Sequence, residues 1–424
     1  MSDLSRRDML AMLGAAALTP LARYGWRGPA RDPGLGAGPG FRIRTITAGT
    51  TLRSPADTEG PEAALAFLKG AKRAVADAGY EVQTLRIATQ PFLEGAGSRA
   101  RADALPALHA LDRAVVAENV LLSIGPVLAP DDYDAEFAAW AAELIRTTRN
   151  VSFSARVASP ERGASPRGVT AAGEAMAAIA RATALGIGNF RFAAAANVPA
   201  GTPFFPVAYH RGSDAVAIGL ESPPLLSAAF AAANTLAEAK QSLTQLLESR
   251  LGSLERFVRQ LARRDERTYL GIDVSPAPGK DASIGAAIET LTGVPFGDYS
   301  TLAGCAAITD VLKSLRVKTC GYSGLMLPVL EDPVLARRAS EGRYSVRDLL
   351  LYSTVCGTGL DVVPLPGDTP ADRLAALIAD VAALSTKLRK PLSARLFPVP
   401  GKSVGERAHF DDPYLTDCVV MKAE

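Results

Sequence analysis

Two cysteines are the residues of this sequence best suited to covalent chemistry. Cys320 and Cys356 are each followed directly by a glycine, in stretches that we predict to be loops, where a ligand could approach the thiol. A thiolate is a strong nucleophile when a neighbouring group takes up its proton. Asp273 lies at the end of a predicted strand and His210 at the end of a long predicted loop, and both are candidates for that acid–base partner. These residues predict a thiol-assisted reaction.

The cysteines also have a structural interpretation. The sequence holds four, and in an oxidising compartment four cysteines allow three disulfide pairings. Cys305 lies among small residues of a helical window, where it is expected to be buried. Reactive thiol and structural disulfide both stay open.

Seven further residues are candidates for substrate binding. Three of them are arginines, which recognise carboxylates through two parallel hydrogen bonds: Arg44, Arg156 and Arg191. The others are polar residues at predicted strand ends or before a helix: Asn197, Asp298, Ser300 and Asp361. Asp298 or Ser300 could instead be a helix N-cap, and Asn197 a turn residue.

Common catalytic motifs are missing from the sequence. Its three histidines form no H-E-x-x-H motif, no Cys/His pairs have zinc spacing, and there is no G-x-S-x-G. Gly401-Lys402-Ser403 is no P-loop, because Leu396 stands where the first glycine belongs. A hard-cation site remains open, built from carboxylates: Asp273, Glu331, Asp332 and Asp361.

The stretch TCGYSGLMLPVLED, residues 319–332, combines a thiol with an acid pair. Its apolar middle, GLMLPVL, predicts a buried strand. In an extended chain the two ends would lie roughly 30 Å apart. Cys320 and the pair Glu331-Asp332 are therefore separate hypotheses unless the strand bends, for example at Pro328.

These residues need a framework, and the chain offers alternating β-rich and helical runs from Phe41 onward. The predicted main strands are 41–48, 81–89, 120–127, 151–157, 189–198, 215–222, 269–279, 359–365 and 392–399. This order predicts a mostly parallel sheet with helices outside. About ten strands suit an α/β barrel larger than eight strands, or a broad open sheet. A leucine stripe predicts one long helix at about 222–264.

Composition and the N-terminus bound the function classes. Among 424 residues, 46 Lys and Arg balance 44 Asp and Glu, which argues against a nucleic-acid partner. Arg6 and Arg7 precede an apolar run, Met9 to Ala22, that is shorter than the roughly 20 residues of a membrane span. We therefore predict a twin-arginine export signal in 1–30 and a Gly/Pro-rich linker in 31–40.

That signal predicts the twin-arginine translocase as a partner during export and a periplasmic or other extracytoplasmic location. The rest of the chain, 41–424, is expected to form one soluble domain without a stable membrane span.

Several blocks together resemble the domain-of-unknown-function 711 family. They include RIRTITAGTTL, NFRFAAAANVPAGTPFFPVAYH, CGYSGLMLPVLED and CGTGLDVVPLPGD, and the resemblance covers Phe41 to the C-terminus. It implies a ten-stranded α/β barrel similar to that of pyruvate formate-lyase and ribonucleotide reductase, and no established activity. The glycyl-radical pattern R-V-x-G-Y is not met, because RVKTCGY, residues 316–322, has two extra residues before its glycine.

The sequence thus predicts an enzyme that acts on a small polar, anionic metabolite in a barrel cavity, without a glycyl radical. A non-catalytic ligand-binding protein and a metal-dependent hydrolase are the alternatives. No cofactor is indicated, and a homo-oligomer stays open.

Overall fold

Short aliphatic runs form one curved sheet. The computed structural model describes residues 40–423, so the predicted export signal and nearly all of the linker lie outside the described residues. The strands are β1 (Arg42–Thr50), β2 (Val82–Thr89), β3 (Val120–Leu128), β4 (Val151–Ser159), β5 (Gly163–Ala164), β6 (Phe192–Ala196), β7 (Ala215–Glu221), β8 (Thr268–Pro276), β9 (Gly359–Pro366) and β10 (Leu392–Val399). Their order is β8-β7-β1-β2-β3-β4-β6-β10-β9, with β5 beside β4. A separate hairpin pairs β11 (Arg407–Ala408) with β12 (Cys418–Val419).

Most neighbouring strands are parallel, as the alternation of strands and helices predicted. The run β1-β2-β3-β4-β6 is parallel throughout, and so are the pairs β7-β8 and β9-β10. Antiparallel contacts of β1 with β7 and of β6 with β10 join these three blocks. The prediction of a mostly parallel ten-stranded sheet is confirmed.

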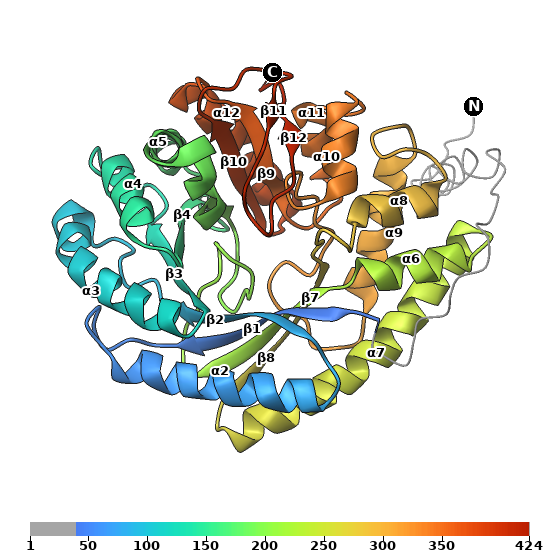
Figure 1. The fold of residues 1–424 in the computed structure, drawn as a ribbon, viewed down its shortest axis with the longest axis horizontal. Helices are drawn as coiled ribbons and strands as arrows, with labels where there is room; N and C mark the ends of the chain where they lie inside the picture. The colour runs from blue at the N-terminus through green and yellow to red at the C-terminus, as the bar shows by residue number, and fades with distance from the viewer. Residues whose placement is uncertain (1–39, 424) are drawn as a thin grey trace, which may run out of the picture.

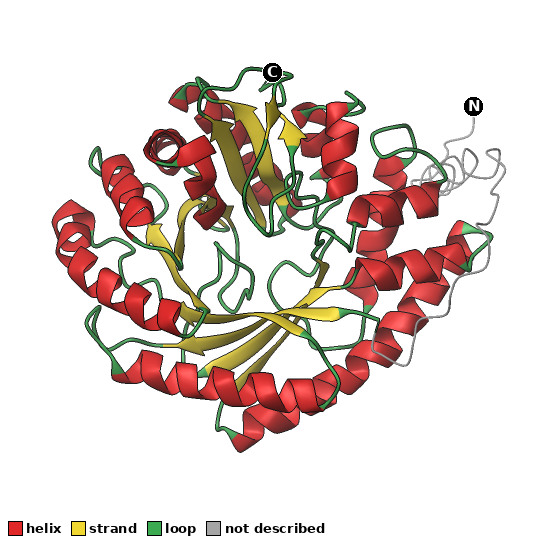
Figure 2. Ribbon diagram, in the orientation of Figure 1, coloured by secondary structure: helices red, strands yellow, loops and turns green. Residues whose placement is uncertain are grey.

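Helices cover the outer face of the curved sheet, and loops lie inside the curve (Figures 1 and 2). The helices of the described chain are α2 (Glu59–Asp77), α3 (Gly97–Ala117), α4 (Phe137–Thr147), α5 (Pro166–Ala182), the 3-10 helix η1 (Ala184–Arg191), α6 (Pro223–Ala231), α7 (Leu236–Arg264), α8 (Ile284–Thr292), α9 (Thr301–Ser314), α10 (Pro333–Ser340), α11 (Val346–Tyr352) and α12 (Ala371–Leu388). In the described part of the chain, no helix has the length and apolar character needed to cross a membrane.

The helix predicted over 222–264 is two helices. α6 ends at Ala231, and α7 begins at Leu236. The side chain of Thr235 accepts a hydrogen bond from the backbone N–H of Glu238, and Glu238 accepts one from the backbone of Asn234. These caps satisfy backbone donors that would otherwise be free, so a new helix starts here. The leucine stripe itself is confirmed, because its residues are buried along α7.

The strand predicted at GLMLPVL is wrong, although its burial is right. The stretch 319–332, which contains GLMLPVL, lies between the edge strands β8 and β9, with one parallel bridge to each, Ile272 to Thr319 and Pro328 to Asp361. Its backbone N–H groups at Tyr322 and Ser323 bond the Asp273 carboxylate instead of a neighbouring strand. Strand pairing therefore does not close into a barrel within residues 40–423, and the likeness to the pyruvate formate-lyase barrel stays a prediction.

Candidate functional site

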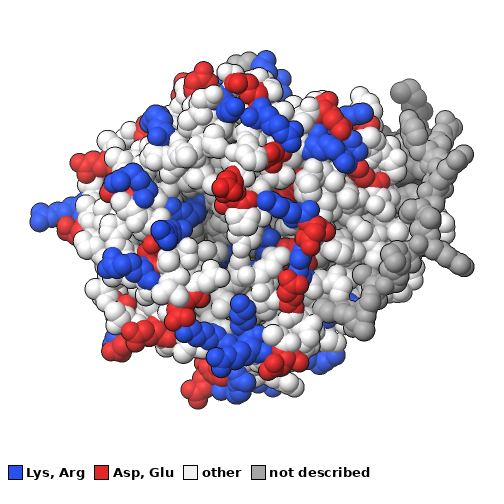
Figure 3. All heavy atoms as spheres, viewed as in Figure 1, with Lys and Arg blue, Asp and Glu red and all other residues white. Residues whose placement is uncertain are grey.

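A cavity of about 360 Å³ lies inside the curve of the sheet. Its size is within the range of small-molecule sites. Figure 3 shows a hollow near the middle of one face, with basic side chains beside it. The lining combines aromatic and aliphatic side chains with a few charged ones, which are Arg44, Arg86, Arg149, Arg191, Glu331, Asp361, Arg395 and Asp412.

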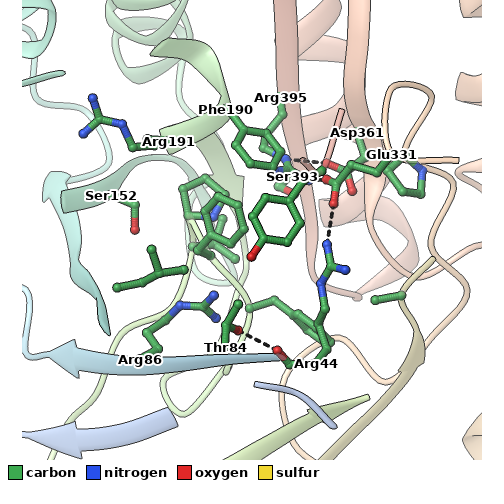
Figure 4. A pocket seen from close by; sticks show the side chains of 18 of the residues that line it. Arg44, Thr84, Arg86, Ser152, Phe190, Arg191, Glu331, Asp361, Ser393 and Arg395 are labelled. Atoms are coloured by element: carbon green, nitrogen blue, oxygen red, sulfur yellow. Dashed lines mark hydrogen bonds and ion pairs between the residues drawn. The ribbon is translucent and has the colours of Figure 1, made fainter. Parts of the chain in front are cut away.

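Two arginines and two carboxylates form an ion-pair chain across one wall (Figure 4). Arg44 Nη2 lies 3.0 Å from Glu331 Oε2, and Arg395 Nη2 lies 2.7 Å from Glu331 Oε1. Arg395 Nε also donates to Asp361 Oδ1 at 2.5 Å. Because each carboxylate contacts a cation, this wall is close to charge balance and is held rigidly.

Arg86 is a buried cation without a carboxylate partner in the described part of the chain. Its side chain is 2% exposed; Nη1 donates to the carbonyl of Pro203, and Nε has no partner. Loss of solvation, with the nearby cations Arg44 and Arg395, lowers the pKa of Arg86 to about 9. A charge that burial penalises in this way favours the arrival of an anion.

Aromatic rings hold the guanidinium groups in place. The centroid of Phe205 lies 5.1 Å from the guanidinium carbon of Arg86 and 5.5 Å from that of Arg395. Phe190 packs edge-on against Phe205, with ring centroids 4.9 Å apart. Cation–π contact and restricted rotamers orient both cations before a ligand arrives.

The third polar feature is a set of hydroxyl groups. The Tyr322 hydroxyl donates to Ser393 Oγ at 2.8 Å, and Ser393 Oγ donates to the Thr358 carbonyl at 3.2 Å. Burial raises the pKa of Tyr322 well above its ordinary value, so its hydroxyl stays protonated at neutral pH. These residues line the cavity and supply neutral hydrogen-bonding groups.

Three of the predicted substrate-binding residues line the cavity: Arg44, Asp361 and Arg191. The guanidinium of Arg191 points away from the ion-pair chain (Figure 4). It donates to the hydroxyl and carbonyl of Thr148 and to the carbonyl of Val151, at the end of α4. Loss of solvation lowers the pKa of Arg191 to about 10. This arginine caps a helix, a role the sequence did not predict.

The other predicted substrate-binding residues lie outside the cavity lining. Arg156 pairs with Glu94 at 2.7 Å, and Asn197 donates to Ser385 at 2.9 Å. Asp298 contacts Arg343 at 3.4 Å on the surface. Ser300 occupies the N-cap position of α9, although its side chain makes no capping hydrogen bond. The structure thus places these four residues outside the cavity that Arg44, Arg191 and Asp361 line.

The residues predicted to be catalytic are also not in the cavity lining. The carboxylate of Asp273 is fully buried and accepts hydrogen bonds from Ser275, Tyr322 and Ser323. His210 is buried and lies against Gly49. The structure brings neither of them to a cysteine by a hydrogen bond, within the residues that it describes.

All four cysteines are free thiols in the structure, so the disulfide alternative is not met there. The glycines beside Cys320 and Cys356 have packing explanations. A Cβ on Gly321 would collide with Asp273, and one on Gly357 would lie 2.5 Å from Gly324 Cα. Cys356 is buried, and loss of solvation raises the pKa of the partly exposed Cys320 well above its ordinary value. The environment of Cys320 therefore does not favour a thiolate.

The four carboxylates considered for a hard cation are divided among different tasks. Asp332 caps α10 and also accepts from the backbone of Ile284, while Asp273 holds the segment after β8. Glu331 and Asp361 both contact Arg395. Within residues 40–423, no group of three or more His, Cys, Asp and Glu side chains could hold a metal ion.

Among the cavity residues that sequence reasoning missed, five supply polar groups to the walls described above: Arg86, Tyr322, Thr358, Ser393 and Arg395. It considered Glu331 only as a metal ligand. A signal existed for the two arginines, because each stands inside an otherwise apolar strand, "LRIA" in β2 and "ARLF" in β10. Charged residues are almost never fully buried unless paired or functional.

Comparison with known proteins places this chain in a family. The family model described as "Uncharacterised ACR (DUF711)" matches residues 38–411. The chain is 35% identical over 280 residues to a "UPF0210 protein" of Pyrobaculum islandicum, covering 62% of this chain and 60% of that protein. A "UPF0210 protein" of Syntrophobacter fumaroxidans is 30% identical over 356 residues, covering 78% and 77%. One of Desulforamulus reducens is 28% identical over 400 residues, covering 87% and 88%.

Proposed function

Since the chain belongs to the DUF711 family, whose description names no activity, we propose a function from its cavity: it binds a small metabolite with one carboxylate and an apolar body. The supporting observation is Arg86, a buried cation that lines the cavity and has no carboxylate partner in the described part of the chain. The aromatic lining suits the apolar body.

The charge of the cavity favours a monoanion. Glu331 and Asp361 offset Arg44 and Arg395, and Glu221 contacts both Arg44 and Arg42. Beside this ion-pair chain, Arg86 then remains as a guanidinium without a carboxylate partner among the described residues; Arg149, Arg191 and Asp412 also line the cavity. Nε and Nη2 of Arg86 donate no hydrogen bond to residues 40–423. This edge of a guanidinium fits the two oxygens of a carboxylate.

Binding is common to two versions of this proposal. In the enzyme version, the hydroxyls of Tyr322 and Ser393 and the carboxylates of Glu331 and Asp361 face the ligand. In the second version, the cavity binds its ligand without turnover. Thiol assistance by Cys320 or Cys356 requires a ligand that reaches beyond the cavity lining. Replacing both cysteines with serine tests it, because unchanged turnover by that variant would remove the thiol from the reaction.

The family resemblance and the N-terminal signal complete the proposal. A sheet that curves around a central cavity, with one segment between its edge strands, is compatible with the barrel that the resemblance implies. Export by the twin-arginine route would deliver the folded domain to an extracytoplasmic compartment.

The binding experiment uses pentanoate and 4-phenylbutanoate with their matched amides. Isothermal titration calorimetry on the full chain should detect the carboxylates and not the neutral amides. Arg86→Met should weaken carboxylate binding by about 10- to 100-fold, the value of one strong charge-assisted contact. Thermal melting verifies that the variant is folded. Amides that bind as well as acids, absence of carboxylate binding at millimolar concentration, or binding unaffected by Arg86→Met would overturn the proposal.

A further inference from the structure

Two buried donors on the cavity wall have no hydrogen-bond partner. They are the Thr358 hydroxyl oxygen Oγ1 and Arg395 Nη1, and neither atom has a partner among residues 40–423. Thr358 is 2% exposed and Arg395 is 6% exposed, and both residues line the cavity. Burying a donor without a partner costs free energy, so such atoms in a cavity indicate a ligand acceptor.

The two donors belong to one wall. Ser393 donates its backbone N–H to the Thr358 carbonyl at 2.7 Å, which places Thr358 at the start of β10. Ser393 and Arg395 are two residues apart on β10 and both line the cavity. Alternate residues of a strand point to the same face, so the side chains of Ser393 and Arg395 follow one another along this wall, and Thr358 lies beside Ser393 on the neighbouring segment.

The charge on this wall selects a neutral acceptor. Arg395 contacts Asp361 at 2.5 Å and Glu331 at 2.7 Å, so its charge is already balanced. A second ligand carboxylate beside Thr358 would lie near both of these anions and be repelled. A carbonyl oxygen has two lone pairs and no charge, so it can accept from a hydroxyl and a guanidinium together.

We infer that the ligand is an oxo-monocarboxylate, with its carboxylate on Arg86 and its oxo group between Thr358 and Arg395. The guanidinium carbons of the two arginines lie 5.1 and 5.5 Å from the same Phe205 ring centroid, so a short molecule spans them. This inference rests on the proposed function, and it adds the second group that the ligand must carry.

The test is calorimetric titration of the full chain with molecules of nearly equal size: pentanoate, 2-oxopentanoate, 4-oxopentanoate and glutarate. One oxo acid should bind at least about tenfold more tightly than pentanoate, because a site built for hydrogen bonding rejects the analogue that lacks the acceptor. Glutarate should bind more weakly than pentanoate. In Thr358→Val the oxo preference, which is the ratio of oxo-acid affinity to pentanoate affinity, should fall below about threefold.

Thr309→Val is the matched control, because its hydroxyl is also buried without a partner but does not line the cavity. It should keep the oxo preference. Oxo acids that bind no better than pentanoate, or glutarate as the tightest ligand, would refute the inference while Arg86-dependent pentanoate binding leaves the proposed function standing. Loss of all carboxylate binding would remove both.

Discussion

At the scale of single residues, two arginines at the same cavity have opposite roles because their partners differ. Arg191 donates to three oxygen atoms at 2.9–3.0 Å, at the end of α4 and the start of β4. Arg86 has one backbone acceptor, the Pro203 carbonyl, and an unpartnered Nε. The first arrangement stabilises the fold, whereas the second leaves a buried charge poised for a ligand.

Substitution of each arginine by methionine should separate these roles. Arg191→Met leaves several buried acceptors unsatisfied and should lower the free energy of unfolding by about 3 kcal/mol. Arg86→Met removes an uncompensated buried charge, so its stability should be unchanged or higher. Urea titration of the ligand-free proteins measures both values. A large stability loss in Arg86→Met would mean that Arg86 is a structural residue.

Carboxylate affinity should fall at high pH. Because burial lowers the pKa of Arg86 to about 9, its guanidinium loses its charge above that pH in the ligand-free protein. Pentanoate affinity should then fall by about tenfold for each pH unit above 9 and be flat from pH 6 to 8. Titration calorimetry across this range provides the test, and an affinity that is constant to pH 10.5 would contradict it.

The lowered pKa of Arg86 also determines the direction in which the free energy of unfolding changes with pH. Above about pH 9, and below the ordinary pKa of an arginine, the unfolded chain holds the Arg86 proton and the folded chain does not. The penalty for burying this charge is therefore complete below pH 9 and declines above it. The stability difference between wild type and Arg86→Met should shrink as the pH rises past 9.

At the scale of elements, the stretch 319–332 is held in place by one carboxylate, that of Asp273. Asp273 accepts from the backbone N–H groups of Ser275, Tyr322 and Ser323 and from the Ser275 hydroxyl. The same segment carries Tyr322 and Glu331 to the cavity. Asp273 therefore serves the site by positioning a segment, without lining the cavity itself.

Asp273→Asn should loosen this segment. The amide of asparagine places an N–H group where the carboxylate accepts hydrogen bonds. We therefore expect the free energy of unfolding to fall by about 3 kcal/mol. Hydrogen exchange at Tyr322 and Ser323 should accelerate before that of the β-sheet. Asp298→Asn is the control, because its exposed pair with Arg343 should contribute less than about 1 kcal/mol. Equal effects of the two substitutions would contradict the assignment.

At the scale of the whole molecule, the cavity needs nearly the whole described chain. Arg44 from β1 meets Glu331, and the Tyr414 ring, between β11 and β12, lies 5.3 Å from the Arg44 guanidinium carbon. Lys280 donates to the Asp412 carbonyl and ties this C-terminal loop to the loop after β8. No single part of the domain contains the site.

The export prediction concerns residues outside the described range. Residues 1–40 fused to a reporter enzyme should deliver it out of the cytoplasm in a host with the twin-arginine translocase. The double substitution Arg6→Lys and Arg7→Lys should retain the reporter inside, and a host without the translocase should do the same. Export that ignores the arginine pair would disprove this localisation.

The sequence by itself determined the parallel α/β sheet, the outer helices and the family. Hydrophobic periodicity and helix punctuation are local properties, so they can be read without knowing distant partners. It also led to Arg44, Arg191 and Asp361 as residues near the cavity. It failed at the break before α7, where Asn234, Thr235 and Glu238 form a cap that a leucine stripe conceals.

Tertiary structure alone decided which charges meet and which remain single. Glu331 contacts Arg44 and Arg395, residues that are 287 and 64 positions away. The Asp273 carboxylate accepts hydrogen bonds from the backbone N–H groups of residues 322 and 323, which are about fifty positions away. No local sequence pattern could indicate this contact. Arg86 differs from Arg191 in the oxygen atoms and in the neighbouring charges that the folded chain brings to it. Whether a buried polar group has hydrogen-bond partners depends on the fold. Here this difference separates Arg86, the candidate ligand contact, from Arg191, the structural arginine.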